Sequence, residues 1–208
     1  MAALCSGAEV GYRRTGLNAG FMCFLDINRI QMKKEIEVTK SWLEKVVVGL
    51  NLCPFARQPF SMGRIRYIVY EGADIVQLSK VMVQEAQYLS RQPPAEVETA
   101  LLILSNALPD FFDYLDFIEE AEWLIRENGL EGIVQLASFH PDYQFAGTEP
   151  EAPENYTNRS PYPMLHLLRE ESIERVLENY EHPEEIPARN IEKMRELGVE
   201  GIRKLMGE

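Results

Sequence analysis

The sequence predicts a small three-layer α/β domain built on a mostly parallel, three-stranded sheet. Three β-rich segments begin near Arg64, Glu98 and Gly132, at even spacing, and an amphipathic helix is predicted between each pair. This alternation is typical of βαβ units with right-handed crossovers, which place helices on the faces of a parallel sheet. Strand order is not readable from such a pattern, so an α+β ferredoxin-like arrangement is the alternative.

The strands and helices of this βαβαβ unit each have a local signal. The segment 64–71 is rich in β-branched and aromatic residues, and the segment 99–105 is almost continuously apolar, as in strands covered on both faces. A helix is predicted to follow each of them, over 74–92 and over 110–128, and a third strand over 132–139. The apolar stripe of each helix is expected to pack against the sheet.

The segments outside this unit have weaker patterns. Residues 1–30 show no helical or strand period and are interpreted as an N-terminal tail, so the single domain is expected to span 31–208. Residues 140–160, rich in Pro, Gly, Asn and Asp, form a long loop of a kind that is usually functional or disordered. Further helices are expected before the first strand, at the C-terminus, and after the loop, where Ser160 and Pro161 suit an N-cap and a first helical position.

Composition and charge exclude several classes of function. The chain has 208 residues, of which 46% are hydrophobic and 26% charged, an ordinary globular composition. A chain with a net charge of −12 lacks the basic surface of a protein that binds nucleic acid or anionic membranes, and no run is apolar enough to span a bilayer. The three cysteines, Cys5, Cys23 and Cys53, have no C-x-x-C spacing, which favours reduced thiols and a cytoplasmic location.

The main catalytic candidates are two histidines that the predicted fold brings together. In open parallel sheets ligands bind outside the carboxyl ends of the strands, and His140 directly follows the third predicted strand. On the helix expected after Pro161, the residues Tyr162, His166 and Glu170 recur every four positions and share one polar face. With that face turned to the sheet edge, His140 and His166 meet and can carry acid–base chemistry near neutral pH.

Four further residues are candidates for binding a substrate. Arg159 and Arg169 are predicted to hold an anion, because a guanidinium presents a fork that suits carboxylate or phosphate. Tyr143 and Tyr162 are the aromatic candidates beside them. The alternative is that the arginines are structural anchors that donate to loop carbonyls.

Cys53 is the third catalytic candidate. It precedes Pro54 at the start of a predicted helical turn, where a thiol tends to be more acidic and nucleophilic; the alternative is a cysteine packed as a small hydrophobe. With His140, His166 and Glu170 it would make a Cys/His/His/Glu metal set, although only the last two have a ligand-like local spacing. There is no P-loop, G-x-G-x-x-G, G-x-S-x-G or H-E-x-x-H motif, so no cofactor is specified.

Two functions of different class are consistent with these residues. The first is an enzyme that acts on a small anionic metabolite through a His/Arg-lined site at the C-terminal edge of the sheet, assisted by a thiol or a metal. The alternative is a non-catalytic binding or assembly module, in which the aromatic-rich loop and the acidic face of the helix at 110–128 contact a partner. Convergence of Cys53, His140, Arg159 and His166 on one pocket would favour the enzyme. The patterns specify no oligomeric state.

Three segments also carry a family resemblance. They are WLEKVVVGLNLCPFA (42–56), SFHPDYQFAGT (138–148) and NRSPYPMLHLLRE (158–170). They resemble the signatures of the bacterial domain-of-unknown-function family 1415, and the resemblance extends from about Ser41 to Gly198. It implies a bacterial-type cytoplasmic protein and places every candidate site residue inside a signature segment, but it implies no catalytic assignment.

Overall fold

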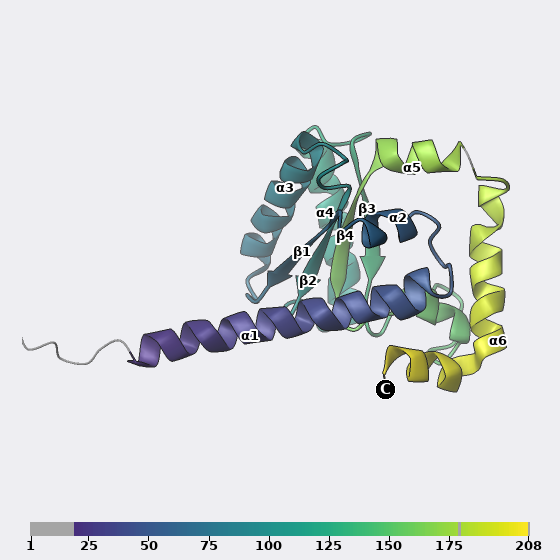
Figure 1. The fold of residues 1–208 in the computed structure, drawn as a ribbon, viewed down its shortest axis with the longest axis horizontal. Coiled ribbons are helices and arrows are strands. Elements are labelled where there is room, and N and C mark those ends of the chain that lie inside the picture. Colours follow the sequence, from purple (N-terminus) through teal and green to yellow (C-terminus); the bar gives the residue numbers. More distant parts are fainter. Residues whose placement is uncertain (1–18, 179, 208) are drawn as a thin grey trace, which may run out of the picture.

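The computed structural model describes residues 19–178 and 180–207, which form a four-stranded sheet with helices on both faces (Figure 1). The α/β class predicted from the sequence is confirmed. In chain order the elements are α1 (Ala19–Trp42), the π-helical η1 (Leu43–Val48), α2 (Arg57–Ser61), β1 (Ile65–Tyr70), α3 (Ile75–Arg91), β2 (Thr99–Leu104), α4 (Phe111–Glu127), β3 (Val134–Phe139), the 3-10 turn η2 (Pro153–Thr157), β4 (Met164–Arg169), α5 (Glu170–Leu177), the 3-10 turn η3 (Pro183–Glu185) and α6 (Ile186–Met206).

The sheet is mixed and has one strand more than predicted. Its order is β1-β2-β4-β3, with β1 and β2 parallel and β4 antiparallel to both of its neighbours. β1, β2 and β3 therefore run in the same direction, but β4 separates β2 from β3. The prediction of a mostly parallel, three-stranded sheet is wrong in both the number of strands and the direction in which neighbouring strands pair. The ferredoxin-like alternative is not observed either, because its βαββαβ element order differs from the βαβαββ order found here.

The additional strand, β4, occupies the segment in which a helix is expected after Pro161, and that prediction is wrong. Pro161 and Pro163 flank Tyr162, and a residue that precedes proline is pushed toward an extended backbone. The apolar run that begins at Met164 then pairs with β2 on one side and β3 on the other. Its Met and Leu residues are good helix formers, but pairing in the middle of a sheet overrides that propensity.

One face of the sheet is covered by α3 and α4. Both helices begin at the aspartates that cap them, since the Asp74 side chain accepts from the backbone N–H of Gln77, and Asp110 accepts from those of Phe112 and Asp113. Their apolar stripes pack on alternate strand residues. The large side chains of this part of the core are Leu78, Met82, Leu89, Leu102, Leu104, Tyr114, Phe117, Leu165 and Leu167.

The opposite face is covered by the C-terminal end of α1, by η1 and by α6. The buried side chains there include Trp42, Val46, Leu101, Ile103, Met164, Met194 and Ile202. Every residue of β2 is buried, as its continuous apolar run predicts. Of the predicted N-terminal tail, residues 1–18 lie outside the described residues, whereas 19–30 form the first half of α1, which extends past the edge of the sheet (Figure 1).

The long loop between β3 and β4 is ordered around one buried amide. The Asn155 Oδ1 atom accepts from the Phe145 backbone N–H and the Thr148 hydroxyl, and its Nδ2 atom donates to the carbonyls of Glu149 and Pro150. Asn155 is completely buried, so all four hydrogen bonds are shielded from water. Side-chain contacts, more than secondary structure, therefore fix this loop against the sheet.

Candidate functional site

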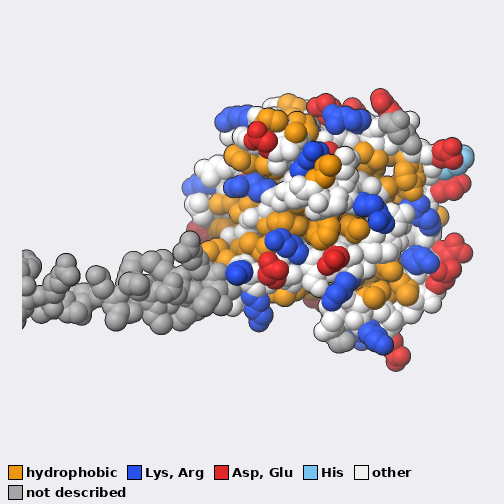
Figure 2. Space-filling model, in the orientation of Figure 1, with side chains coloured by type: hydrophobic (Ala, Val, Ile, Leu, Met, Phe, Trp, Pro, Cys, Tyr) orange, Lys and Arg blue, Asp and Glu red, His pale blue; other side chains and the backbone are white. Residues whose placement is uncertain are grey.

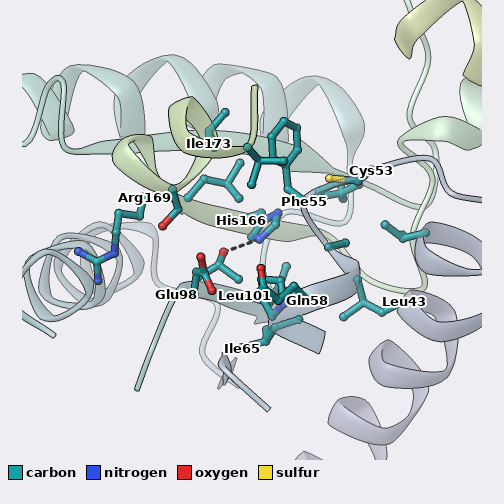
Figure 3. A pocket seen from close by; sticks show the side chains of 18 of the residues that line it. Leu43, Cys53, Phe55, Gln58, Ile65, Glu98, Leu101, His166, Arg169 and Ile173 are labelled. Atoms are coloured by element: carbon teal, nitrogen blue, oxygen red, sulfur yellow. Dashed lines mark hydrogen bonds between the residues drawn. The ribbon is translucent and has the colours of Figure 1, made fainter. Parts of the chain in front are cut away.

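The candidate site is a narrow cavity between the sheet and the short helices α2 and α5, called the slot below (Figure 3). Its volume is about 70 Å³. Apolar side chains make up most of the lining, chiefly Trp42, Phe55, Ile65, Leu101, Phe139 and Ile173. The polar side chains at the slot are few: Cys53, Gln58, Glu98, Thr99, His166, Arg169 and Ser172. An apolar lining with a small number of placed polar groups is typical of small-molecule sites, and the slot is smaller than the roughly 300–1,000 Å³ of most of them.

His166 lies in the middle of β4 and points into the slot. It pairs with Leu101 of β2 and Ala137 of β3, so its side chain is on the sheet face that carries α1. Its Nε2 atom is 2.6 Å from the Thr99 hydroxyl oxygen, which is itself 2.7 Å from the Leu167 carbonyl oxygen. Threonine has one hydroxyl proton, and the carbonyl can only accept, so Thr99 donates to Leu167 and must accept from His166. The proton of the neutral imidazole is therefore on Nε2.

The other ring nitrogen of His166 remains open. Nδ1 points away from Thr99, toward the side where Phe55 and Cys53 lie (Figure 3), and no hydrogen bond to it comes from the part of the chain that the structure describes. Burial among apolar side chains lowers the pKa of His166 to about 4. The imidazole is therefore neutral near pH 7 and presents a lone pair to the slot.

Cys53 is the second predicted residue at the slot. Burial raises the pKa of its thiol, and this effect exceeds the opposing effect of hydrogen bonds from the backbone of Phe55 and Ala56. The thiol is thus protonated near neutral pH, unlike the acidic nucleophile suggested by its position before Pro54. Cys53 and His166 line the same cavity, but in the form of a thiol and a neutral imidazole.

His140 does not meet His166, so the prediction that the two converge is wrong. Neighbouring residues of β3 alternate between faces: the Phe139 ring contacts Trp42 on the α1 side, and the His140 ring packs against Tyr114 of α4. Both nitrogens of His140 are used within the fold, because Nδ1 accepts from the Asp142 N–H at 3.0 Å and Nε2 lies 3.2 Å from the Leu108 carbonyl. His140 is completely buried and fixes the start of the long loop.

Both predicted anion-binding arginines donate to backbone carbonyls. A terminal nitrogen of Arg169 lies within 3.2 Å of the carbonyl oxygens of Leu89, Gln92 and Val97, at the end of α3 and before β2. Arg159 donates to the carbonyls of Tyr143 and Pro150 and lies over the Tyr156 ring in the long loop. These contacts match the structural-anchor alternative. Arg169 borders the slot, but its guanidinium points away from His166 (Figure 3).

The two predicted tyrosines lie outside the slot. The Tyr143 ring packs against Phe111 and Phe145 in the long loop. Tyr162 precedes β4, packs in the α1-side core, and its carbonyl accepts from the Ser160 hydroxyl. The predicted Tyr162–His166–Glu170 stripe on one helix does not exist, because Tyr162 lies before β4, His166 lies within it and Glu170 starts α5.

The edge at which β1 and β2 end has its own cavity, of about 400 Å³. It is lined by Asn106 and by three carboxylates of α4, Asp113, Asp116 and Glu120. None of the predicted site residues lines it. The slot instead lies over one face of the sheet, where β1 and β2 begin, at Ile65 and Thr99, and where β4 ends, at Arg169.

The predicted Cys/His/His/Glu metal set is not assembled, because His140 is on the opposite face from His166. Within residues 19–178 and 180–207, one group of side chains has metal-ligand spacing: His182, Glu184 and Glu185, all exposed. His182 Nδ1 lies 3.2 Å from Glu184. In the same ranges, no helix is both long and apolar enough to cross a membrane.

Comparison with known families matches residues 34–204 to the family described as "Protein of unknown function (DUF1415)". The chain belongs to this family. The DUF1415 match begins inside α1 and contains all four strands and every residue of the slot named above. Comparisons with curated proteins and with solved structures gave no significant match.

Several slot residues of this DUF1415 protein are absent from the sequence prediction. Thr99 is the most consequential, because it sets the protonated nitrogen of His166 from 67 positions away in the chain. Its only sequence signal is that it is a hydroxyl residue at the start of an otherwise apolar strand. Ser172 of α5 also borders the slot, and its buried hydroxyl oxygen has no hydrogen-bond partner within the described residues. Trp42 and Phe139 form an edge-to-face pair with centroids 5.4 Å apart.

Proposed function

We propose that the protein binds a small, uncharged, mainly apolar molecule in the slot, and that His166 accepts a hydrogen bond from it. The observation that carries this proposal is the open Nδ1 atom of His166 in an apolar cavity. An acceptor that lines an apolar cavity and has no partner in the protein can gain one hydrogen bond from a ligand that supplies a donor, which adds about 0.5–1.5 kcal/mol of affinity and fixes the orientation of the ligand. The surface on this side supports the idea, since a band of hydrophobic side chains crosses the middle of the molecule, bordered by charged side chains of both signs (Figure 2).

The properties of His166 favour binding over proton transfer. With a pKa of about 4, roughly one imidazole in a thousand is protonated at pH 7. A general base is most effective when its pKa lies near the working pH, and a base this weak takes a proton poorly. The protonated thiol of Cys53 is likewise a weak nucleophile. The enzyme suggested by the sequence is therefore the less favoured function of this site.

The arginine contacts also favour an uncharged ligand. The terminal nitrogen of Arg169 lies near three carbonyls, so an anion would have to compete with them for it. Glu98, which lines the slot, pairs with Arg64 at 3.8 Å, so that arginine is engaged as well. The small anionic metabolite expected from the sequence thus loses its main support.

A pair of matched ligands tests the proposal. Phenol and toluene have the same shape, but only phenol carries a hydrogen-bond donor. We expect phenol to bind the full chain about threefold to tenfold more tightly than toluene, the range of one net hydrogen bond, as measured by NMR titration. In His166→Leu this preference should disappear while toluene still binds.

His182→Leu is the matched control, because it removes an exposed histidine that does not line the slot. It should leave the phenol preference unchanged. Equal affinities of phenol and toluene in the unmodified protein, or a preference that survives in His166→Leu, would refute the role of His166. Binding of neither ligand would refute the slot as a binding site.

A further inference from the structure

A second cavity adjoins the slot on the side of α6. Its volume is about 560 Å³, and it shares three lining residues with the slot, namely Val47, Cys53 and Phe139. We propose that the two cavities form one elongated site for a neutral hydrocarbon chain with a hydrogen-bond donor at one end, such as a long-chain alcohol. This inference rests on the proposed function, because the donor end is the part that meets His166.

The lining of the second cavity fits a hydrocarbon chain. Leu52 and Phe145 border it from the two loops, and Ile186, Pro187 and Ile191 border it from α6. A chain that starts at His166 and passes the shared residues would exchange water for apolar contacts along its whole length. Each methylene group buried in this way is worth about a fourfold gain in affinity.

The polar groups of the second cavity are already bonded within the protein. The Thr148 hydroxyl donates to the Asn155 Oδ1 atom, and the side-chain amide of Asn190 donates to the Leu52 carbonyl. The amide of Asn158 donates to the Ser138 carbonyl. The open Nδ1 atom of His166 is in the slot, so the donor end of the ligand belongs in the slot and the chain in the wider cavity.

The glutamates at both cavities are already paired with arginines, which favours a neutral ligand. Glu98 lines the slot and pairs with Arg64 at 3.8 Å, and Glu154 lines the second cavity. Glu154 pairs with Arg195 at 2.7 Å, so that arginine is engaged as well. A fatty acid would bring a carboxylate toward one of these glutamates, whereas an alcohol of the same length would not.

The 1-alkanols from butanol to decanol are the probe series. Binding to the full chain can be followed by the fluorescence of Trp42, which lines the slot, in a Trp123→Phe background that removes the exposed second tryptophan. We expect affinity to rise about fourfold for each added methylene until the chain fills both cavities. Decanoate at pH 7 should bind at least tenfold more weakly than decanol.

Ile191→Trp fills the second cavity from α6 without touching the slot. Butanol should bind this variant as it binds the parent, while the gain with chain length should stop at a shorter alcohol. Ile191→Ala is the matched control, in which affinity should rise with chain length up to the same alcohol as in the parent or a longer one. Ile186→Trp, on the same helix, provides the same test if the first variant does not fold.

The outcomes separate this inference from the proposed function. If His166→Leu weakens every alcohol but neither tryptophan variant shortens the series, the slot binds the donor and the chain does not enter the second cavity. Equal binding of decanol and decanoate would overturn the neutral head group. If no alcohol binds, or if His166→Leu has no effect, the proposed function itself fails.

Discussion

Acid should destabilise this protein through His166. The pKa of this imidazole is about 4 in the folded protein, against 6.5 for an unperturbed histidine. As the pH falls below 6.5, the unfolded chain binds a proton that the folded protein does not, so the free energy of unfolding decreases. The loss begins near pH 6.5, is nearly complete at pH 4, and is absent above pH 7. Burial also lowers the pKa of His140, which adds a loss of the same sign.

The expected magnitude follows from the two pKa values of His166. Between pH 7 and pH 4 their separation corresponds to about 3 kcal/mol. That is a large part of the 5–15 kcal/mol by which a typical domain is stable. In His166→Leu this contribution is removed, because leucine does not titrate and fits an apolar slot.

Urea unfolding at a series of pH values measures this effect. The unmodified protein should lose about 3 kcal/mol more than His166→Leu between pH 7 and pH 4. His182→Leu, which removes the exposed histidine, should lose as much as the unmodified protein. If His166→Leu and the unmodified protein lose the same free energy within about 0.5 kcal/mol, the buried, neutral state of His166 is refuted.

Three other changes test the fold around the site. Tyr114→Phe removes a buried hydroxyl that donates to the Met164 carbonyl at 2.7 Å and accepts from the Phe139 N–H at 3.0 Å. Thermal melting should show that this variant is less stable by about 2–4 kcal/mol. Tyr88→Phe, which changes an exposed tyrosine, is the control and should have an effect near zero. Asn155→Ala should open the long loop, detected as new proteolytic cleavage within 141–154 while the melting of the sheet changes little. A chain that starts at Met32 should melt within a few degrees of the full chain; a clear drop would show that the first half of α1 stabilises the domain.

Local patterns predict most of the secondary structure. The strands β1, β2 and β3 and the helices α3 and α4 form where their periodicity and caps indicate, because those signals lie within one segment. The capping by Asp74 and Asp110 is of this kind. β4 could not be predicted in the same way, since its residues suit a helix when isolated and become a strand only between β2 and β3.

Because β4 was predicted as a helix, some site residues were predicted correctly but for the wrong structural reason. Cys53 and His166 do line one cavity, but His166 points there because residues of a strand alternate between faces, with Leu165 and Leu167 on the other side. Thr99 was not predictable as its partner, because their contact depends on the register of β2 against β4. His140 fixes the start of the long loop, and Arg169 donates to carbonyls at the end of α3. From the sequence alone, such structural roles look the same as ligand binding.

The position of β4 also constrains how the chain reaches its native state. The strand that lies between β2 and β3 is the last of the four in sequence, so β3 has no partner until residues 164–169 are available. During synthesis, β1 and β2 can pair through α3 well before then, while the inner edge of β2 stays open. Contacts such as Thr99 with Leu168 join distant parts of the chain, and such non-local pairing slows folding. The slot, which needs His166 beside Thr99, therefore forms only in the final step of sheet assembly.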